Sequence, residues 1–499
     1  MSARLPRLVM SGKPLRDRTD ETLRMLIASN YPATLFSHGD ALCRQYGNRL
    51  QDLNLDILRD ILTRRADFVA KEAQGGRRRT KIVNPPEDVM RSILCSGVHL
   101  FPPVGGIQFW PIISPGGDLC IQSGYDQRTR LIYVPPAGFK LPDVPERPTD
   151  SDVARAVALL REVFINFPFA DKASFGNTIG ATLTIALRSA IHGRVLMFVV
   201  DSPVRGTGKT LLAQAIVLSV TGEMPGQIPD CKDDEEWAKR LTTVASEGAP
   251  VALFDDIRAT LKSPVFAMFV TAPIWKNRLL GTNSAPSYPN NSVLLVTGNN
   301  VQLNEDFERR VCLIRLDAGT FRPYERDPGA FKHPDLLKWV STESRPAILA
   351  AIFTMARAWY AAGSPSPQKL RPLGGFEEHM RVIGGILEFA GIDGFMGNTG
   401  IVQERSKQDN ADVVQLLANL EAHYQGKAFT TGDLVDDSDA DDLIWDLVAP
   451  PTIPRDARKL GRLFLKFNGR PLREDNLRVE RCAEKEHNAV LWRVVRDGV

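Results

Sequence analysis

The sequence contains few cysteines and no arrangement of them that is typical of a metal site or a disulfide framework. None of them forms a Cys-X-X-Cys pair, and no histidines cluster around them. This argues against a zinc module and against a disulfide-stapled fold, so we expect a reducing, cytoplasmic environment. The six cysteines are Cys43, Cys95, Cys120, Cys231, Cys312 and Cys482.

Long hydrophobic runs and a strong net charge are also absent. The apolar part of the N-terminal MSARLPRLVM is too short for a signal peptide, and no segment approaches a membrane span. The net charge is only +3, so a nucleic-acid site would have to be a local basic patch. At 499 residues and 43% hydrophobic content, the chain can bury two to four domain cores.

Proline-rich and glycine-rich segments predict a division into an N-terminal α+β domain over 1–145, a central domain over 150–400 and a small domain over 405–499. The segment PPAGFKLPDVPERPTD, residues 135–150, is typical of an extended linker because its prolines block a helix. Helical and strand-like patterns alternate in the central part, which favours a parallel sheet flanked by helices.

Two helices are predicted before the first strand of the central domain. The pattern DVARAVALLREVF begins at Asp152, and Asp150 or Ser151 is the expected N-cap. The second helix is expected over residues 172–191.

Residues 196–212, LMFVVDSPVRGTGKTLL, are the most informative stretch of the chain. An apolar strand, a glycine-bearing turn and a helical segment form the context of a phosphate-binding loop, although Pro203 replaces the first glycine of GxxxxGK[ST]. Backbone amides at a helix N-terminus attract phosphate, Lys209 would reach the β- and γ-phosphates from an exposed loop, and Thr210 would ligate Mg²⁺. The alternative is a chance Gly/Lys turn. The predicted nucleotide contacts are Pro203, Arg205, Gly206, Thr207, Gly208, Lys209, Thr210 and Leu211.

A pair of acids follows the next apolar run, VALFDD, at residues 251–256. We expect Asp255 and Asp256 at the end of a buried strand, beside the phosphate loop. Asp255 would hold the hydrated Mg²⁺ and Asp256 would polarise the attacking water. The alternative is that the acids only form a turn.

A third apolar run, SVLLVTGNN at 292–300, ends in two amides. Asn299 and Asn300 are able to hold the lytic water or to contact the γ-phosphate, although Asn-Asn also suits a plain turn.

Two arginines stand before the last apolar run of the central domain, DFERRVCLIRLD at 306–317. Arg309 or Arg310 can stabilise the charge that develops on the nucleotide of a neighbouring subunit. The alternative is a surface arginine pair.

These motifs, in this order and within about 115 residues, resemble those of AAA+ ATPases. More narrowly, they are similar to the superfamily III-type helicases of phages, plasmids and prophages. The resemblance implies ATP and Mg²⁺ as cofactors, a hexameric ring, Asn299 as sensor 1, and Arg309 or Arg310 as the arginine finger. It also implies a helical lid at FEEHMRVIGGIL, residues 376–387, with Arg381 as sensor 2. Asp256 stands where many AAA+ proteins have glutamate, and the shorter acid would slow hydrolysis.

A β-hairpin is expected between the second and third apolar runs, at WKNRLLGTNSAPSYPNN, residues 275–291. By resemblance to ring helicases, such a hairpin grips single-stranded DNA. Lys276 and Arg278 would contact phosphates and Tyr288 would stack on a base. A hairpin that only packs subunits together explains the same residues.

A basic amphipathic helix is predicted at RDARKLGRLFLKFNGR, residues 455–470, followed by a β-hairpin. This order looks like a winged helix, and the local basic excess favours the DNA backbone over a protein partner. The expected DNA contacts are Arg455, Arg458, Lys459, Arg462 and Lys466.

The sequence thus predicts an α/β AAA+ core with an N-terminal α+β domain and a C-terminal winged helix. The expected function is an ATP-dependent DNA helicase of a mobile element, acting in replication on single-stranded or forked DNA. One alternative is an ATPase switch in regulation or defence that remodels protein partners. Another is a DNA-binding initiator that assembles with ATP and does not unwind DNA.

Overall fold

The computed structural model describes most of the chain. The residues it leaves undescribed are 1–4, 75–76, 232, 258–260, 278–285, 321, 436–444, 446–447, 451–452, 454, 469–476, 487–488 and 497–499. The chain divides into two compact units, Met1–Gly400 and Ile401–Val499. Among the described residues, no helix has the length and apolar character needed to cross a membrane.

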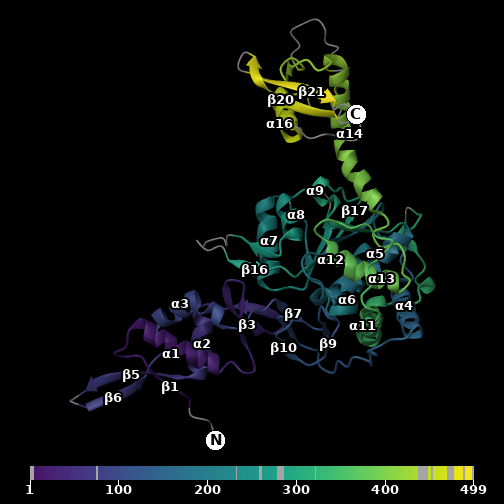
Figure 1. The fold of residues 1–499 in the computed structure, drawn as a ribbon. Helices are drawn as coiled ribbons and strands as arrows, with labels where there is room; N and C mark the ends of the chain where they lie inside the picture. The colour runs from purple at the N-terminus through teal and green to yellow at the C-terminus, as the bar shows by residue number, and fades with distance from the viewer. Residues whose placement is uncertain are drawn as a thin grey trace. The chain divides into compact units, whose positions relative to one another are not determined.

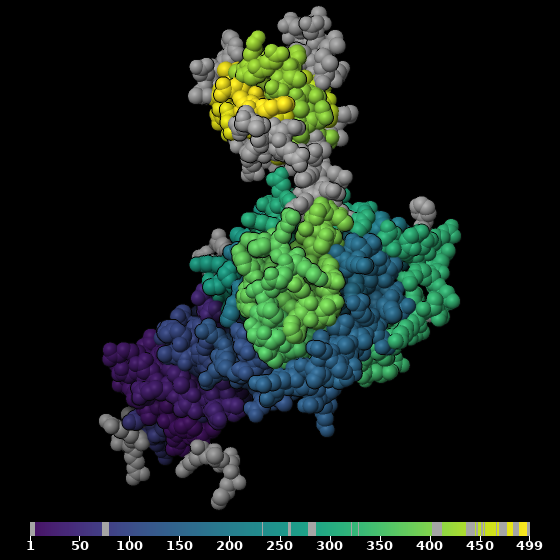
Figure 2. Space-filling view, turned by 45° about the vertical axis from the view of Figure 1, so that its right-hand side comes forward, coloured from purple at the N-terminus to yellow at the C-terminus, as the bar shows by residue number. Residues whose placement is uncertain are grey.

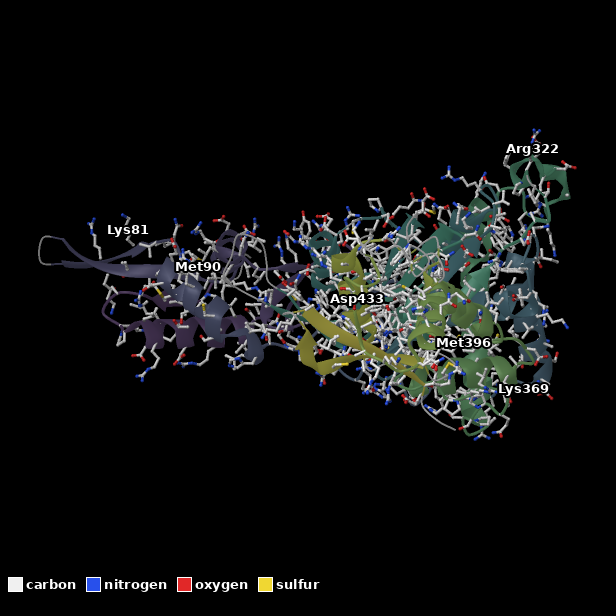
Figure 3. All side chains as sticks on the ribbon, turned by 90° about the horizontal axis from the view of Figure 1, so that it is seen from above. Lys81, Met90, Arg322, Lys369, Met396 and Asp433 are labelled. Carbon is white, nitrogen blue, oxygen red and sulfur yellow. The ribbon has the colours of Figure 1, made fainter. Side chains whose placement is uncertain are left out.

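The N-terminal part of the first unit combines helices with two small sheets. Strand β1 pairs in parallel with β5, which pairs antiparallel with β6 (Lys81 of β6 is labelled in Figure 3), while β2, β3 and β4 form an antiparallel sheet. The helices bury aliphatic side chains, and Met90, also labelled in Figure 3, belongs to this core. The bounds are β1 (Arg7–Val9), α1 (Leu15–Ala28), β2 (Leu35–His38), β3 (Ala41–Tyr46), β4 (Arg49–Asp52), α2 (Leu55–Arg65), β5 (Asp67–Gln74), β6 (Arg77–Ile82) and α3 (Glu87–Ser96).

Short strands then lead toward the central sheet, as the proline-rich and glycine-rich sequence requires. They form one sheet in the order β10-β11-β7 and a separate β8-β9 pair. Trp110 lies between β7 and β8 in the chain and is buried, and its indole N–H donates to the carbonyl of Ala186. The bounds are β7 (Gly106–Gln108), β8 (Ile112–Ile113), β9 (Leu119–Cys120), β10 (Gly124–Asp126) and β11 (Leu131–Tyr133).

The centre of the first unit is a five-stranded sheet in the order β13-β14-β17-β12-β18, with every strand parallel to its neighbours. Its main strands are nearly continuous apolar runs because helices cover both faces of a parallel sheet. The predicted α/β sheet flanked by helices is confirmed. The bounds are β12 (Met197–Ser202), β13 (Gln227–Ile228), β14 (Val251–Ile257), β17 (Val293–Asn299) and β18 (Val311–Arg315).

Helices pack around this sheet in the arrangement of Figure 1. Helix α5 contacts α6 and β18, and α6 also contacts β12 and β17. Figure 2 shows the green residues of α11 and its successors lying against the blue residues of α4 and α5. The bounds are α4 (Asp150–Phe164), α5 (Lys172–Ala186), α6 (Lys209–Thr221), α7 (Asp234–Ser246), α8 (Pro264–Thr271), α9 (Glu305–Glu308), α10 (Leu336–Trp339), α11 (Arg345–Ala361), α12 (Glu377–His379), the π-helix η6 (Met380–Gly384) and α13 (Gly385–Phe389).

The predicted N-cap of α4 was wrong. Thr149, and not Asp150 or Ser151, caps the helix: its hydroxyl accepts from the amide of Asp152 at 3.3 Å, and the Asp152 carboxylate accepts from the amide of Thr149 at 2.8 Å. This reciprocal capping box uses two amide donors, which a cap at Asp150 or Ser151 would leave unpaired.

The described part of the second unit contains a small sheet in the order β19-β21-β20 and the helices α14 and α16. The buried face of α16 contributes Leu460, Phe464 and Phe467 to a core that includes Trp492 of β21. The predicted amphipathic helix and the hairpin after it are present. The bounds are α14 (Thr399–Tyr424), β19 (Phe429–Thr430), α16 (Ala457–Phe467), β20 (Leu477–Glu486) and β21 (Ala489–Arg496).

His379 is an ionisable group buried behind the central sheet. The Thr184 hydroxyl donates to the carbonyl of Gly180, so the His379 Nε2–H donates to the Thr184 oxygen at 2.9 Å. The other ring nitrogen is buried without a partner among the described residues. Burial, and then the positive charge of Arg188, lower the pKa of His379 from 6.5 to about 3.

We expect His379 to make the fold sensitive to acid. Because its pKa is lower in the folded state than in the unfolded chain, the unfolded state binds more protons between pH 6.5 and about 3. Stability is full above this window, and this group removes about 2 kcal/mol by about pH 5. Urea unfolding at neutral and acidic pH should show a smaller loss in His379→Leu. The same change at the exposed His99 is the control, and an undiminished loss in His379→Leu would contradict the assignment.

Candidate nucleotide-binding site

The order of the central strands brings the predicted motifs to one edge of the sheet. Strand β17 lies between β12 and β14, and Ser202 at the end of β12 pairs with Asn299 at the end of β17. Parallel strands end on the same side, so the loop after β12, the amide after β17 and the acids of β14 lie close together. The crevice at the carboxyl ends of such strands is the usual ligand site of open α/β sheets.

The loop between β12 and α6 has the backbone that a phosphate cradle needs. Gly206 and Gly208 have φ angles of 82° and 94°, a left-handed region that side chains rarely adopt. Pro203 has no amide to donate, and the Ser202 hydroxyl closes the turn around it by accepting from the amide of Val204 and donating to its carbonyl. Although Pro203 departs from the glycine pattern, Gly206 and Gly208 both keep the left-handed conformation.

We expected Lys209 on an exposed loop. In the structure it is the first residue of α6, and only 9% of it is exposed. Its Nζ donates to Oδ1 of Asn299 at 2.8 Å. Burial lowers the pKa of the Lys209 ammonium, and the carboxylates of Asp201, Asp256 and Asp255 act in the opposite direction. The ammonium is thus held at the sheet edge by an amide and surrounded by negative charge.

The two acids of β14 have different surroundings. Asp255 Oδ1 accepts from the hydroxyls of Thr210 at 3.0 Å and Thr297 at 2.6 Å. Asp256 follows at a bulge in β14 with a φ of 55°, and its amide donates to the Thr297 hydroxyl at 3.0 Å. Thr297 of β17 therefore fixes both acids, while Asp255 alone is bonded to Thr210.

A threonine hydroxyl and a carboxylate at hydrogen-bonding distance are oxygen ligands that suit Mg²⁺. Among the described residues no group of three or more His, Cys, Asp or Glu side chains could hold a metal ion alone. A magnesium site of this kind does not need one, because Mg²⁺ commonly takes one or two protein ligands, substrate phosphates and waters.

Asp201 is a residue of this site that the sequence analysis missed. It is fully buried in β12, its Oδ1 accepts from the amide of Val301 at 2.9 Å, and its Oδ2 lies 3.3 Å from Nη1 of Arg315. An acid inside an otherwise apolar strand was the available signal, since a buried carboxylate requires partners.

A pocket of about 300 Å³ opens beside the phosphate loop. Phe167 and Tyr324 flank the two glycines, so closely that a Cβ on Gly206 would lie 3.1 Å from the Tyr324 ring. The described lining is aromatic and apolar with Asn166, Arg326 and His333, and it contains no carboxylate. This pocket was not predicted from the sequence because its walls combine residues from before β12, from the glycine loop and from after β18.

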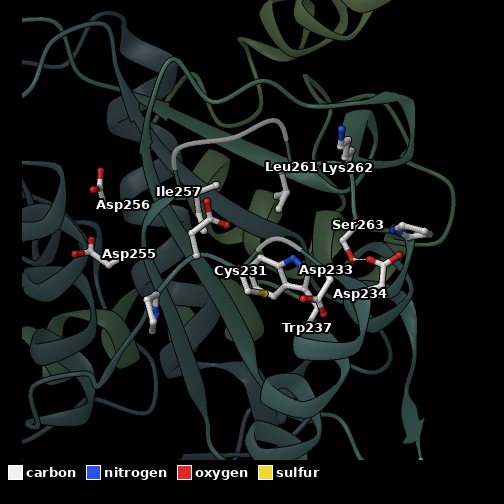
Figure 4. Close-up of a pocket in the computed structure, with 13 residues that line it drawn as sticks. Cys231, Asp233, Asp234, Trp237, Asp255, Asp256, Ile257, Leu261, Lys262 and Ser263 are labelled. Atoms are coloured by element: carbon white, nitrogen blue, oxygen red, sulfur yellow. Dashed lines mark hydrogen bonds between the residues drawn. The ribbon is translucent and has the colours of Figure 1, made fainter.

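A second pocket, of about 1000 Å³, lies on the acidic side of the site. Figure 4 shows Asp255 and Asp256 at one end and Asp233 and Asp234 toward the other. Asp230 also lines it, and Lys262 is the one cation in its described lining. So many carboxylates repel phosphate, and the loop side of the site is the favourable side for a polyphosphate chain.

Arg309 and Arg310 lie at the opposite end of the sheet from the phosphate loop. The carbonyl of Arg310 accepts from the amide of Met197, the first residue of β12, which is roughly 17 Å of strand from the last. The Arg310 side chain is 16% exposed and lies 4.0 Å from the Asp306 carboxylate. Arg309 is exposed, and its guanidinium has no hydrogen-bond or ion-pair partner among the described residues.

Arg381 is not brought to the phosphate loop. Its guanidinium donates twice to the Glu378 carboxylate, each time at 2.8 Å, and lies over the Trp359 ring. These partners belong to α12 and α11 and not to the loop, β14 or β17. Among the described residues, Arg381 therefore has no hydrogen bond, ion pair or ring contact with the loop, β14 or β17.

The expected hairpin forms, but Tyr288 is not available to stack on a base. Strands β15 (Ile274–Lys276) and β16 (Ser287–Pro289) pair antiparallel. Tyr288 is 2% exposed and its hydroxyl donates to the Asp52 carboxylate at 2.9 Å, because the N-terminal sheet packs on the hairpin. Lys276 is exposed on β15, whereas Arg278 lies outside the described residues.

In the second unit, α16 separates its side chains as predicted. Leu460, Phe464 and Phe467 are buried, whereas Leu465 is exposed. The basic residues Arg458, Lys459 and Arg462 of the helix, and Arg455 ahead of it, are exposed. The side chain of Lys466 is outside the described part of the structure.

No protein-family model matches the chain, and no curated protein matches it. Among solved structures, the A form apo structure of the NrS-1 C terminal region is 11% identical, with a TM-score of 0.38 over 93% of this chain and 96% of that chain. A second structure of that region is 11% identical, with a TM-score of 0.35 over 85% and 84%. The JCV helicase structure is 15% identical, with a TM-score of 0.22 over 49% and 60%. Values this low establish neither the family nor the function of this chain.

Proposed function

We propose that the chain is an Mg²⁺-dependent ATPase that drives a DNA helicase of a mobile element, acting in replication. The observation that supports this most strongly is the convergence of Lys209, Thr210, Asp255 and Asn299 at the end of the glycine loop, joined by hydrogen bonds of 2.8 and 3.0 Å. A cation, a hydroxyl, a carboxylate and an amide beside a phosphate cradle are the groups that phosphoryl transfer uses.

The two pockets give the nucleotide a direction in this proposal. The base lies in the aromatic pocket beside Phe167 and Tyr324, and the phosphates follow the loop toward Asp255. Lys209 contacts the β- and γ-phosphates, and Asn299 orients the water or the γ-phosphate. Bound Mg²⁺, held by Thr210 and Asp255, would neutralise charge on the phosphates. Asp256, at the bulge of β14, polarises the attacking water.

Lys209→Met should abolish ATP hydrolysis and the unwinding of forked DNA. The methionine keeps the buried stem of Lys209 but removes the positive charge, so turnover should fall about a hundredfold or more. Phosphate release and strand separation are measured on the full chain, with circular dichroism as a check of the fold. Lys140→Met, at an exposed lysine, is the matched control. Unchanged hydrolysis would contradict the site, and wild-type hydrolysis that never separates strands would contradict the helicase.

A ring of subunits, a hexamer in this proposal, explains the position of Arg309. Its own phosphate loop lies at the other end of the sheet, so only the nucleotide of an adjacent subunit is within its reach. Arg310 is held by Asp306 of its own chain, whereas Arg309 has no such partner among the described residues. We therefore assign the arginine that acts in trans to Arg309 and a structural role to Arg310.

Arg309→Ala should inactivate the ring, and mixing should restore part of the activity. An arginine finger contributes on the order of 10³ in turnover in well-studied GTPases. Rings that combine Arg309→Ala and Lys209→Met subunits contain interfaces with an intact loop and an intact arginine, so ATPase activity reappears. Arg310→Ala should retain most activity. Absence of recovery at every mixing ratio, with mixed oligomers confirmed by mass, would refute action in trans.

The second unit is proposed to be a winged helix that binds the DNA backbone. Arg458, Lys459 and Arg462 project from the exposed side of α16, and none of them has an ion-pair partner among the described residues. In the first unit, Lys276 of the hairpin is a further proposed phosphate contact. The N-terminal residues act as an accessory domain in this scheme.

Replacing Arg458, Lys459 and Arg462 together with alanine should weaken binding to duplex or forked DNA and flatten its salt dependence. On duplex DNA, the slope of log K against log [salt] should fall by about 0.9 for each phosphate that the protein no longer neutralises. Basal ATPase activity should be unchanged, since no nucleotide motif lies in this unit. The control replaces the exposed Arg16, Arg64 and Arg91. An unchanged slope would direct α16 to a protein partner.

A further inference from the structure

A third cavity lies at the end of the central sheet opposite the nucleotide site. It has a volume of about 390 Å³, within the range of small-molecule pockets. Its walls come from β7, from the turn before β11, from the end of α5 and the segment after it, and from Asn290 and Asn291 ahead of β17. These segments precede the strands of the sheet, so the cavity is separate from the phosphate loop.

The formally charged side chains that line this cavity are all arginines. They are Arg128, Arg130 and Arg188; His192 also lines the cavity, and its described lining contains no aspartate or glutamate. Arg128 is already paired with Asp118 at 3.2 Å and with Asp126 at 3.6 Å. The other three have no carboxylate in hydrogen-bonding or ion-pair contact among the described residues, so the cavity has an excess of positive charge.

Arg188 has only neutral hydrogen-bond partners among the described residues. Its Nη1 and Nη2 donate to the carbonyls of Ile191 and Gly193, each at 2.8 Å, and its Nε is buried without a partner among the described residues. Burial lowers the pKa of this guanidinium to about 10. Neutral carbonyls offset only part of the cost of burying a charge, and an anion in the adjacent cavity would offset more of it.

Arg130 is held at the rim by a well-bonded turn. Its φ is 58°, and its carbonyl accepts from the amide of Gly105 at 2.7 Å. The turn is closed by Thr129, whose hydroxyl donates to the Asp126 carboxylate at 2.7 Å. A positive φ in a residue other than glycine is uncommon and is found more often at ligand sites, and the Arg130 side chain is exposed.

We propose that this cavity binds a phosphate group, carried either by a nucleic-acid strand or by a free nucleotide. Guanidinium groups match phosphate in geometry and charge, and two arginines with a histidine around one cavity provide several charge-assisted donors. The site is additional to the proposed ATPase site, since no residue of the phosphate loop lines it. A phosphate here lies beside the entrance to β12, which runs from this cavity to the loop.

The test uses Arg130→Ala/His192→Ala in the full chain, because both side chains are exposed and their loss leaves the packing intact. Arg188 is left in place, since its bonds to Ile191 and Gly193 support the segment that leads into β12. The matched control is Arg24→Ala/His99→Ala, at exposed positions that do not line the cavity. Both pairs are also made in the Lys209→Met background, in which the phosphate loop is impaired.

Two probes distinguish the sources of the phosphate. With a fluorescein-labelled oligothymidylate, a strand in the cavity predicts weaker binding and a salt slope reduced by about 0.7 for each phosphate that the variant no longer neutralises. With inorganic pyrophosphate in the Lys209→Met background, a free nucleotide site predicts about a tenfold loss of affinity by calorimetry. Either result supports the site and identifies its source. If neither probe distinguishes the cavity variant from the control, the proposal is overturned, whether or not Lys209 proves essential for ATP hydrolysis.

Discussion

The geometry of the candidate nucleotide site depends on the contacts of the buried Asp201 carboxylate. This carboxylate is buried in β12 one residue before the loop begins to turn, and it bonds the amide of Val301 after β17 and the guanidinium of Arg315 at the end of β18. The carbonyl of Asp201 also accepts from the amide of Leu316. One residue therefore fixes the ends of three adjacent strands. Asn299, two residues before Val301, is held where it meets Lys209, and removal of the carboxylate would leave the half-buried Arg315 cation without this partner.

The parallel sheet also places two groups of proposed functional residues at its opposite ends. Everything that acts on the chain's own nucleotide in the proposed reaction lies where the strands end. Arg309 and Arg310 lie where they begin, joined to the site by the five residues of β18. Because β18 carries Arg315 at its end, the Asp201 contact and the arginine pair belong to the same rigid strand. Residues at the two ends of the sheet are therefore linked through one short strand.

Features that depend on residues close together in the sequence could be predicted from it. Features that depend on contacts between distant residues could not. The strands were predictable because apolar runs such as VLLVTG are buried on both faces. The glycine-bearing turn between β12 and α6 was predictable because its glycines and Lys209 are adjacent in sequence. Tyr288 was misjudged because its partner, Asp52, is far away in the chain. The aromatic pocket escaped notice for the same reason. The pairing of Arg381 with Glu378 was not predicted from the sequence, although the two residues lie three positions apart.

The N-terminal residues hold the hairpin that precedes β17 in place. The amide of Asp40 donates to the carbonyl of Ser287 and its carboxylate accepts from the Ser287 amide, while Asp52 accepts from Tyr288. Gly39 leaves no room for a side chain there, since a Cβ would lie 1.5 Å from the carbonyl of Ser287. The base of the hairpin is therefore fixed by the β2–β4 sheet on one side and by β17, which carries Asn299, on the other.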